Sequence, residues 1–181
     1  MKKVLAILMA LAMVMSFAAC SKTPATEENT TEAQAPVEET SEAAVSGETV
    51  AQTLVAEFKA LAATETDALT VAEALAQSAA VSAISPAAME MELEENYLSG
   101  FDNYEVLGFD KCVMVAPMIG TIPFISYVFT LAEGTDADAF VKGLEDNANL
   151  RWNICTMADE MAAAAEGNLV FFVMAPASLD A

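Results

Sequence analysis

The segment 147–153 contains the most unusual group of side chains in the chain. It includes the only arginine, Arg151, and the only tryptophan, Trp152, together with Asn149 and Asn153. A guanidinium fork can bind a carboxylate ligand, and an indole ring beside it can serve as a stacking wall. The simpler interpretation, which we favour, is that Arg151 neutralises helix carbonyls, Trp152 packs in the core and the asparagines shape a turn.

Two cysteines, Cys112 and Cys155, lie in the part of the chain that we expect to fold. Outside the cytoplasm their thiols could form a disulfide that closes a loop of 43 residues, a constraint that the chain-entropy model values at about 4 kcal/mol. The alternative is two buried free thiols that pack as small apolar groups. A nucleophilic role is disfavoured, because no histidine is present to activate the sulfur.

Three carboxylates, Glu90, Glu92 and Glu94, alternate with the apolar residues around them. On a strand they would project from one face about 6.6 Å apart. Carboxylates at such a spacing can serve glycoside hydrolysis or bind a hard cation. A solvated acidic face that keeps an exposed strand from pairing with another chain is the favoured interpretation.

Composition excludes several kinds of chemistry. The 181 residues include no histidine, so Ser-His-Asp catalysis and histidine-based zinc sites are excluded. Against 27 acidic residues stand only 7 basic ones, and a chain with a net charge of −20 is not expected to bind nucleic acid. No segment has the spacing of an EF-hand loop. We therefore predict no catalytic residue, no metal site and no cofactor.

The first residues have the build of an export signal. Lys2 and Lys3 precede an apolar run of 16 uncharged residues, which is shorter than the roughly 20 that span a bilayer. The run ends in Phe17-Ala18-Ala19-Cys20, which resembles the lipobox of bacterial lipoproteins. The resemblance implies a signal peptide over residues 1–19 and a diacylglyceryl group on Cys20, which anchors the protein to the extracytoplasmic face of the bacterial cell membrane. An ordinary secreted protein and an uncleaved anchor are the alternatives.

Residues 20–48 would then form a lipidated, disordered tether. From 21 to 48 there are seven glutamates, one lysine and only two large apolar residues, Val37 and Val45. Such a segment cannot bury enough apolar surface to offset its conformational entropy. A spacer is the favoured role, and a glycosylated or partner-binding stalk is the alternative.

Residues 49–181 are predicted to form one domain with a net charge of about −16. Helical periodicity predicts helices over 50–62, over 70–80 with Thr70 and Glu73 as a capping box, and from a Thr135 cap, with Asp138 at the third position, to Ala148. Strands are predicted over 89–94, 111–116, 124–131 and, apolar on both faces and so central, 169–175. Residues 159–166 fit a helix or a hairpin strand, and we choose the strand.

The predicted fold class is α+β, with a mainly antiparallel sheet of about five strands and three helices packed on one side. The stretches GFDKCVMVAPMIGTIPFISYVF, GTDADAFVKGLEDNANLRWNIC and EGNLVFFVMAP resemble small α+β domains of unknown function on lipoproteins of anaerobic Gram-positive-type bacteria. The resemblance implies the same fold and location, and it implies no activity.

These patterns predict a non-enzymatic binding or interaction module anchored through Cys20, with an unidentified protein or small-molecule ligand. A groove is expected where the loop 117–123 lies against 147–153, although that loop could equally be a plain strand connection. The alternatives are a structural, charge-presenting surface protein and, less favoured, a carboxylate-based or metal-dependent hydrolase.

Overall fold

The computed structural model describes residues 48–92, 96–118 and 120–179. The predicted signal peptide, Cys20 and all of the predicted tether except Glu48 lie outside the described residues. The helices are α1 (Val50–Ala62), α2 (Ala68–Ala76), a 3₁₀ helix η1 (Ala79–Ile84) and α3 (Ala137–Asn147). The strands are β1 (Pro86–Glu90), β2 (Phe109–Pro117), β3 (Ile125–Leu131), β4 (Glu160–Glu166) and β5 (Leu169–Ala175). In this described part of the chain, no helix has the length and apolarity needed to cross a membrane.

The five strands form one open antiparallel sheet in the order β1-β2-β3-β5-β4. The α+β class and the antiparallel sheet are as predicted. β5 lies between β3 and β4, and all seven of its side chains are buried, which confirms the central strand expected from its apolar sequence. β4 is the strand chosen over a helix for 159–166. It joins β5 through Gly167 and Asn168, and Gly167 has a φ of 60° that suits a tight hairpin turn.

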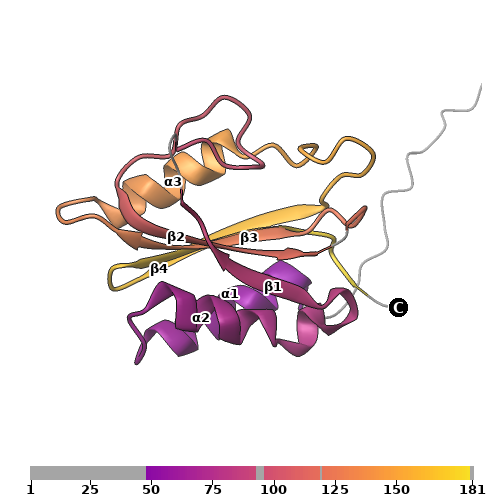
Figure 1. Ribbon diagram of the computed structural model, residues 1–181, viewed down its shortest axis with the longest axis horizontal. Helices are drawn as coiled ribbons and strands as arrows, with labels where there is room; N and C mark the ends of the chain where they lie inside the picture. Colours follow the sequence, from indigo (N-terminus) through magenta and orange to yellow (C-terminus); the bar gives the residue numbers. More distant parts are fainter. Residues whose placement is uncertain (1–47, 93–95, 119, 180–181) are drawn as a thin grey trace, which may run out of the picture. The chain divides into compact units, whose positions relative to one another are not determined.

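Helices cover both faces of the sheet, so the prediction that all three pack on one side is wrong. α1 and α2 lie on one face and α3 on the other (Figure 1). Two adjacent residues of β5 show the reason. Phe171 belongs to the apolar cluster under α1 and α2, whereas Phe172 belongs to the cluster under α3. A sheet that is apolar on both faces needs a cover on each.

In two helices the N-terminal capping residue is an aspartate and not the predicted threonine. The cap of α2 is Asp67 and not Thr70, because the Asp67 carboxylate accepts both the backbone N–H and the hydroxyl of Thr70, at 2.9 and 3.0 Å. The cap of α3 is Asp136 and not Thr135, whose hydroxyl instead donates to the carbonyl of Gly108 at 2.9 Å. At the N-cap position an aspartate side chain accepts a backbone N–H as readily as a threonine hydroxyl does. Its negative charge is also favourable at a helix N-terminus.

The first strand begins earlier than the alternation of residues 89–94 predicts. β1 starts at Pro86 beside Pro117 and ends at Glu90 beside Val113. The pairing with β2 continues for one residue beyond β1, because the Met91 N–H donates to the Cys112 carbonyl at 2.9 Å. Residues 93–95 lie outside the described residues. The predicted row of three carboxylates on one strand is therefore not shown, and only Glu90 lies in β1.

Candidate functional site

In the segment 147–153, which was considered as a ligand-binding site, Asn149 makes hydrogen bonds to other residues of the domain. The side-chain amide of Asn149 donates to both carboxylate oxygens of Asp102, at 2.9 and 3.0 Å. Its side-chain oxygen accepts the Arg151 N–H at 2.9 Å, and its backbone N–H donates to the Gly100 carbonyl at 2.8 Å. Asn149 thus ties the connection after α3 to the connection before β2, which supports the interpretation that it shapes a turn.

Trp152 is half-buried and packs against the apolar cluster under α3. It also lies near Gly100: a Cβ atom at Gly100 would make an ordinary contact with Trp152 Cγ at 3.9 Å, whereas it would lie only 2.3 Å from Met174 Cε. The indole Nε1 is buried and has no hydrogen-bond partner among the described residues. The contacts of Trp152 are therefore those of a packing residue, as the simpler interpretation held.

Arg151 and Asn153 do line a small cavity. Its volume is about 150 Å³, and its other lining residues are Ile154, Cys155, Thr156 and Met157. The expected groove against 117–123 is only partly formed. The Thr156 hydroxyl donates to the Thr121 carbonyl at 2.8 Å, which joins the two loops, but none of the residues described in 117–123 lines this cavity.

Cys112 and Cys155 are both free thiols, so the disulfide that the sequence allowed is not formed. Cys112 lies under α3 in the middle of β2, where burial raises the pKa of its thiol to about 12. Cys155 is exposed in the connection between α3 and β4. The alternative of two buried thiols holds for Cys112 alone.

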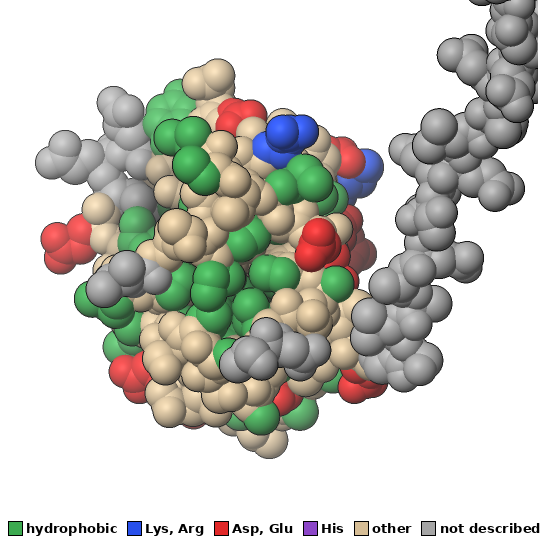
Figure 2. Space-filling view, turned by 90° about the vertical axis from the view of Figure 1, so that its right-hand side faces the viewer, with side chains coloured by type: hydrophobic (Ala, Val, Ile, Leu, Met, Phe, Trp, Pro, Cys, Tyr) green, Lys and Arg blue, Asp and Glu red, His purple; other side chains and the backbone are tan. Residues whose placement is uncertain are grey.

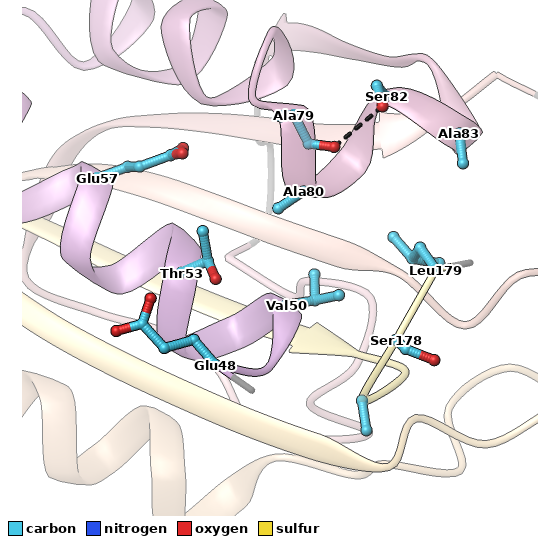
Figure 3. A pocket seen from close by; sticks show the side chains of 11 residues that line it. Glu48, Val50, Thr53, Glu57, Ala79, Ala80, Ser82, Ala83, Ser178 and Leu179 are labelled. Atoms are coloured by element: carbon cyan, nitrogen blue, oxygen red, sulfur yellow. Dashed lines mark hydrogen bonds between the residues drawn. The ribbon is translucent and has the colours of Figure 1, made fainter. Parts of the chain in front are cut away.

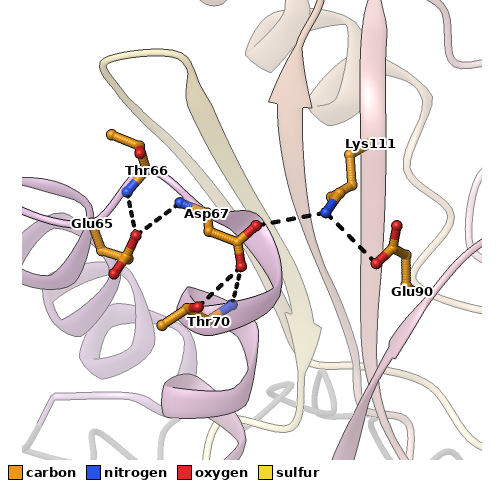
Figure 4. Close-up of polar contacts among 6 residues, drawn as sticks. All are labelled: Glu65, Thr66, Asp67, Thr70, Glu90 and Lys111. Atoms are coloured by element: carbon orange, nitrogen blue, oxygen red, sulfur yellow. Dashed lines mark hydrogen bonds and ion pairs between the residues drawn. The ribbon is translucent and has the colours of Figure 1, made fainter.

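The carboxylates near β1 form ion pairs that connect α2, β1 and β2 (Figure 4). Lys111 on β2 lies 3.6 Å from Asp67 at the start of α2 and 3.6 Å from Glu90 on β1. The Glu65 carboxylate accepts the N–H of Asp67 at 3.0 Å. Hydrogen bonds from Thr70 and the nearby Lys111 charge hold the pKa of Asp67 below its usual value. Within the described residues, no three Cys, Asp or Glu side chains are grouped so as to hold a metal ion.

A larger cavity, which the sequence did not predict, lies between α1, η1 and the chain after β5 (Figure 3). Its volume is about 630 Å³. Val50 and Leu179 face one another across it, and Ala80 points from η1 toward α1. Its polar lining consists of two carboxylates and three hydroxyls, on Glu48, Glu57, Thr53, Ser82 and Ser178.

The chemistry of this cavity follows from the charges on its wall. Glu48 and Glu57 both line it, and none of the lysines and arginine among the described residues does. Small apolar side chains, Ala79, Ala80 and Ala83 among them, supply the remaining surface. The cavity can therefore accept a positively charged group with a small apolar body, and hydroxyls are present to orient it.

Sequence reasoning missed this cavity because its residues carry no motif. They come from three segments far apart in the chain, and the depth of the cavity depends on alanines that resemble ordinary helix residues. The only sequence signal was the pair Glu48, just before the cap of α1, and Glu57, within α1, and such a pair resembles ordinary solvated side chains.

The chain matches no protein-family model, no curated protein and no solved structure. Its function is therefore inferred from the geometry of its own surface.

Proposed function

We propose that the chain is a bacterial lipoprotein, anchored through acylated Cys20 to the extracytoplasmic face of the cell membrane, whose domain 49–181 is a non-enzymatic binding module for a small organic cation. The observation that supports the ligand class is the cavity beside α1, whose wall, as far as the structure describes the chain, has two carboxylates and no cationic side chain. The anchor is supported by the charge and hydropathy pattern of residues 1–20.

The volume of the cavity restricts the ligand. About 630 Å³ lies within the range of roughly 300–1,000 Å³ that is usual for small-molecule sites. One ammonium group can approach Glu48 or Glu57 while its alkyl body covers Val50 and Leu179. An anionic ligand would meet like charge in the cavity and across the acidic domain.

Thermal unfolding of the full chain tests the ligand class. We expect short primary alkylamines to raise the unfolding midpoint and alcohols of the same length to leave it unchanged. At a concentration of 100 times Kd the gain is about 2.7 kcal/mol, which corresponds to several degrees. The double variant E48Q/E57Q should lose the response.

The matched control is the double variant E133Q/E145Q, which removes two exposed carboxylates outside the cavity. It should respond to amines as the wild type does. An equal loss in both double variants would mean that amines bind to the acidic surface in general, and the proposed site would be rejected.

The anchor has its own test. Cys20→Ala removes the acylated sulfur, so the protein should leave the membrane fraction when cells are fractionated. The control Cys155→Ala should stay in that fraction. Retention of the Cys20→Ala protein would contradict lipid anchoring.

A further inference from the structure

Three large apolar side chains stand out at one end of the sheet. Ile154 is 98% exposed, Met118 73% and Met157 51%. Ile154 and Met157 belong to the connection between α3 and β4, and Met118 follows β2. Figure 2 shows hydrophobic side chains gathered over the middle of this end of the molecule. We call Met118, Ile154 and Met157 the loop surface.

The loops that carry these residues are built into the sheet. The connection between α3 and β4 is tied to the loop after β2 by the hydrogen bond from Thr156 to the Thr121 carbonyl, at 2.8 Å. Its two ends are fixed as well, because the Ala158 N–H donates to the Leu150 carbonyl at 2.9 Å and the Asp159 N–H donates to the Ala175 carbonyl at 3.0 Å. The apolar side chains are therefore presented by anchored backbone.

The chain from the predicted anchor joins the domain at this same end. β5 ends at Ala175, beside the loop surface, and the Ala177 carbonyl just beyond it accepts the N–H of Val50 at 3.3 Å. Val50 is the first residue of α1, and Glu48, two residues earlier, is where the described domain begins. Glu48, through which the chain enters the described domain, therefore lies near the end of the sheet that carries the loop surface.

Charge distinguishes these loops from the rest of the domain. Residues 150–158 contain Arg151 and no acidic residue, and Met118 and residues 120–124 contain no charge at all. Three of the carboxylates around these loops are engaged: Asp159 and Glu160 accept the backbone N–H groups of Ala177 and Ala51, both at 3.0 Å, and Asp102 accepts the side-chain amide of Asn149. Glu48, where the chain enters the domain, is exposed. Because salt screens charges beyond about 8–10 Å, an anionic surface that meets this end is repelled less than it would be elsewhere on the domain.

We propose that the loop surface is a membrane-contact site, in which Met118, Ile154 and Met157 enter the headgroup and acyl boundary of the phospholipid bilayer that holds the anchor. The proposal rests on the lipid anchor of the proposed function, which keeps the domain close to the bilayer so that a small apolar surface is enough. A two-fold dimer through the same surface is less favoured, because it would bring two Arg151 side chains together with no carboxylate from these loops to pair with them.

The single tryptophan provides a direct test. Trp152 lies two residues from Ile154 and is the only tryptophan in the chain. The full acylated protein is reconstituted into vesicles of phosphatidylcholine and phosphatidylglycerol whose acyl chains are brominated near the headgroup. We expect bromine to quench Trp152 fluorescence in the wild type and to quench it much less in the triple variant M118S/I154S/M157S.

The matched control is Leu107→Ser, because Leu107 is 59% exposed and lies just before β2, at the opposite end of the sheet. It should be quenched like the wild type. All variants change exposed side chains, so their urea midpoints should agree with that of the wild type. Equal quenching of the triple variant and the wild type, or no quenching of either, would overturn the proposal.

Flotation of the vesicles separates this proposal from that of the anchor. A protein that floats with the vesicles but is not quenched retains its anchor and lacks the membrane contact. A protein that does not float lacks the anchor, which overturns the proposed function and, with it, the membrane contact that rests on it. Crosslinking of Cys155 to Cys155 of a second copy, without quenching, would assign the loop surface to self-association and overturn the proposal.

Discussion

At the scale of single residues, Asp67 is the clearest example of a side chain with more than one structural role. It caps α2, accepts the hydroxyl of Thr70 and pairs with Lys111, which in turn reaches Glu90 on β1. Through this chain of contacts the start of α2 is joined to two strands. Thr70 resembles a cap in the sequence because it precedes a glutamate at the right spacing, but in the structure it donates to the aspartate.

Asp67→Asn should make stability less dependent on pH. The pKa of Asp67 is lowered from 3.8 in the folded protein, mainly by the hydrogen bonds from Thr70. The contribution of the charge is therefore fully present above 3.8 and is lost as the pH falls through the lowered folded pKa. We expect the variant to be less stable than the wild type at neutral pH and equally stable in strong acid, as measured by urea unfolding. A constant difference at every pH would contradict this assignment.

At the scale of elements, the long connection before β2 and the connection after α3 stabilise one another. Gly100 is central to this contact: its carbonyl accepts the Asn149 N–H, and its φ of 96° is a conformation that other residues rarely adopt. The Tyr127 hydroxyl donates to the carbonyl of neighbouring Ser99 at 3.0 Å, which attaches the same turn to β3. Part of the loop surface depends on this packing, because Ile154 and Met157 lie two and five residues after Trp152 in the same connection.

Gly100→Ala should be destabilising, because the new Cβ would lie 2.3 Å from Met174 Cε, and the Met174 side chain, although flexible, is fully buried and must move within a packed cluster. Overpacking of this kind costs about 1–3 kcal/mol, in addition to the strain of a positive φ. Gly134→Ala is the matched control, since Gly134 also has a positive φ, of 83°, and nothing lies within 4 Å of its Cβ position. Urea unfolding should show the larger loss for Gly100→Ala. Equal losses would mean that contact with Met174 is unimportant.

At the scale of the whole domain, one sheet separates two apolar clusters. Phe58 of α1 stacks on Phe171 at 5.4 Å between ring centroids, and on the opposite face Phe101 lies 4.9 Å from Phe172. Because the adjacent residues Phe171 and Phe172 belong to opposite clusters, each cluster depends on the same strand. The two faces should therefore unfold together.

Phe171→Ala and Phe172→Ala test this coupling. Each removes a fully buried ring and should lower the free energy of unfolding by about 3–5 kcal/mol. Trp152 fluorescence reports the α3 face, whereas far-ultraviolet circular dichroism reports all helices. In both variants the two signals should follow one urea transition. A Phe171→Ala protein whose helical signal is lost before its fluorescence changes would show that α1 and α2 unfold separately.

The sequence by itself determined the types and order of the elements, the central position of β5 and the lack of any histidine chemistry. These properties depend on local periodicity and composition: LVFFVMA is apolar at every position, and the stripe of Phe140 and Leu144 requires a covered helix face. Such patterns show which residues avoid water, but they do not show what covers them.

Only the tertiary structure decided which face each helix covers, how Asn149 and Trp152 are used, and where a cavity opens. The helix faces depend on how the connections cross the sheet, and periodicity within a single helix carries no information about that path. The cavity beside α1 joins Glu48, Ala80 and Leu179, which are distant in sequence and have no shared pattern. A space between elements exists only once the elements pack, so short-range patterns in the chain cannot predict it.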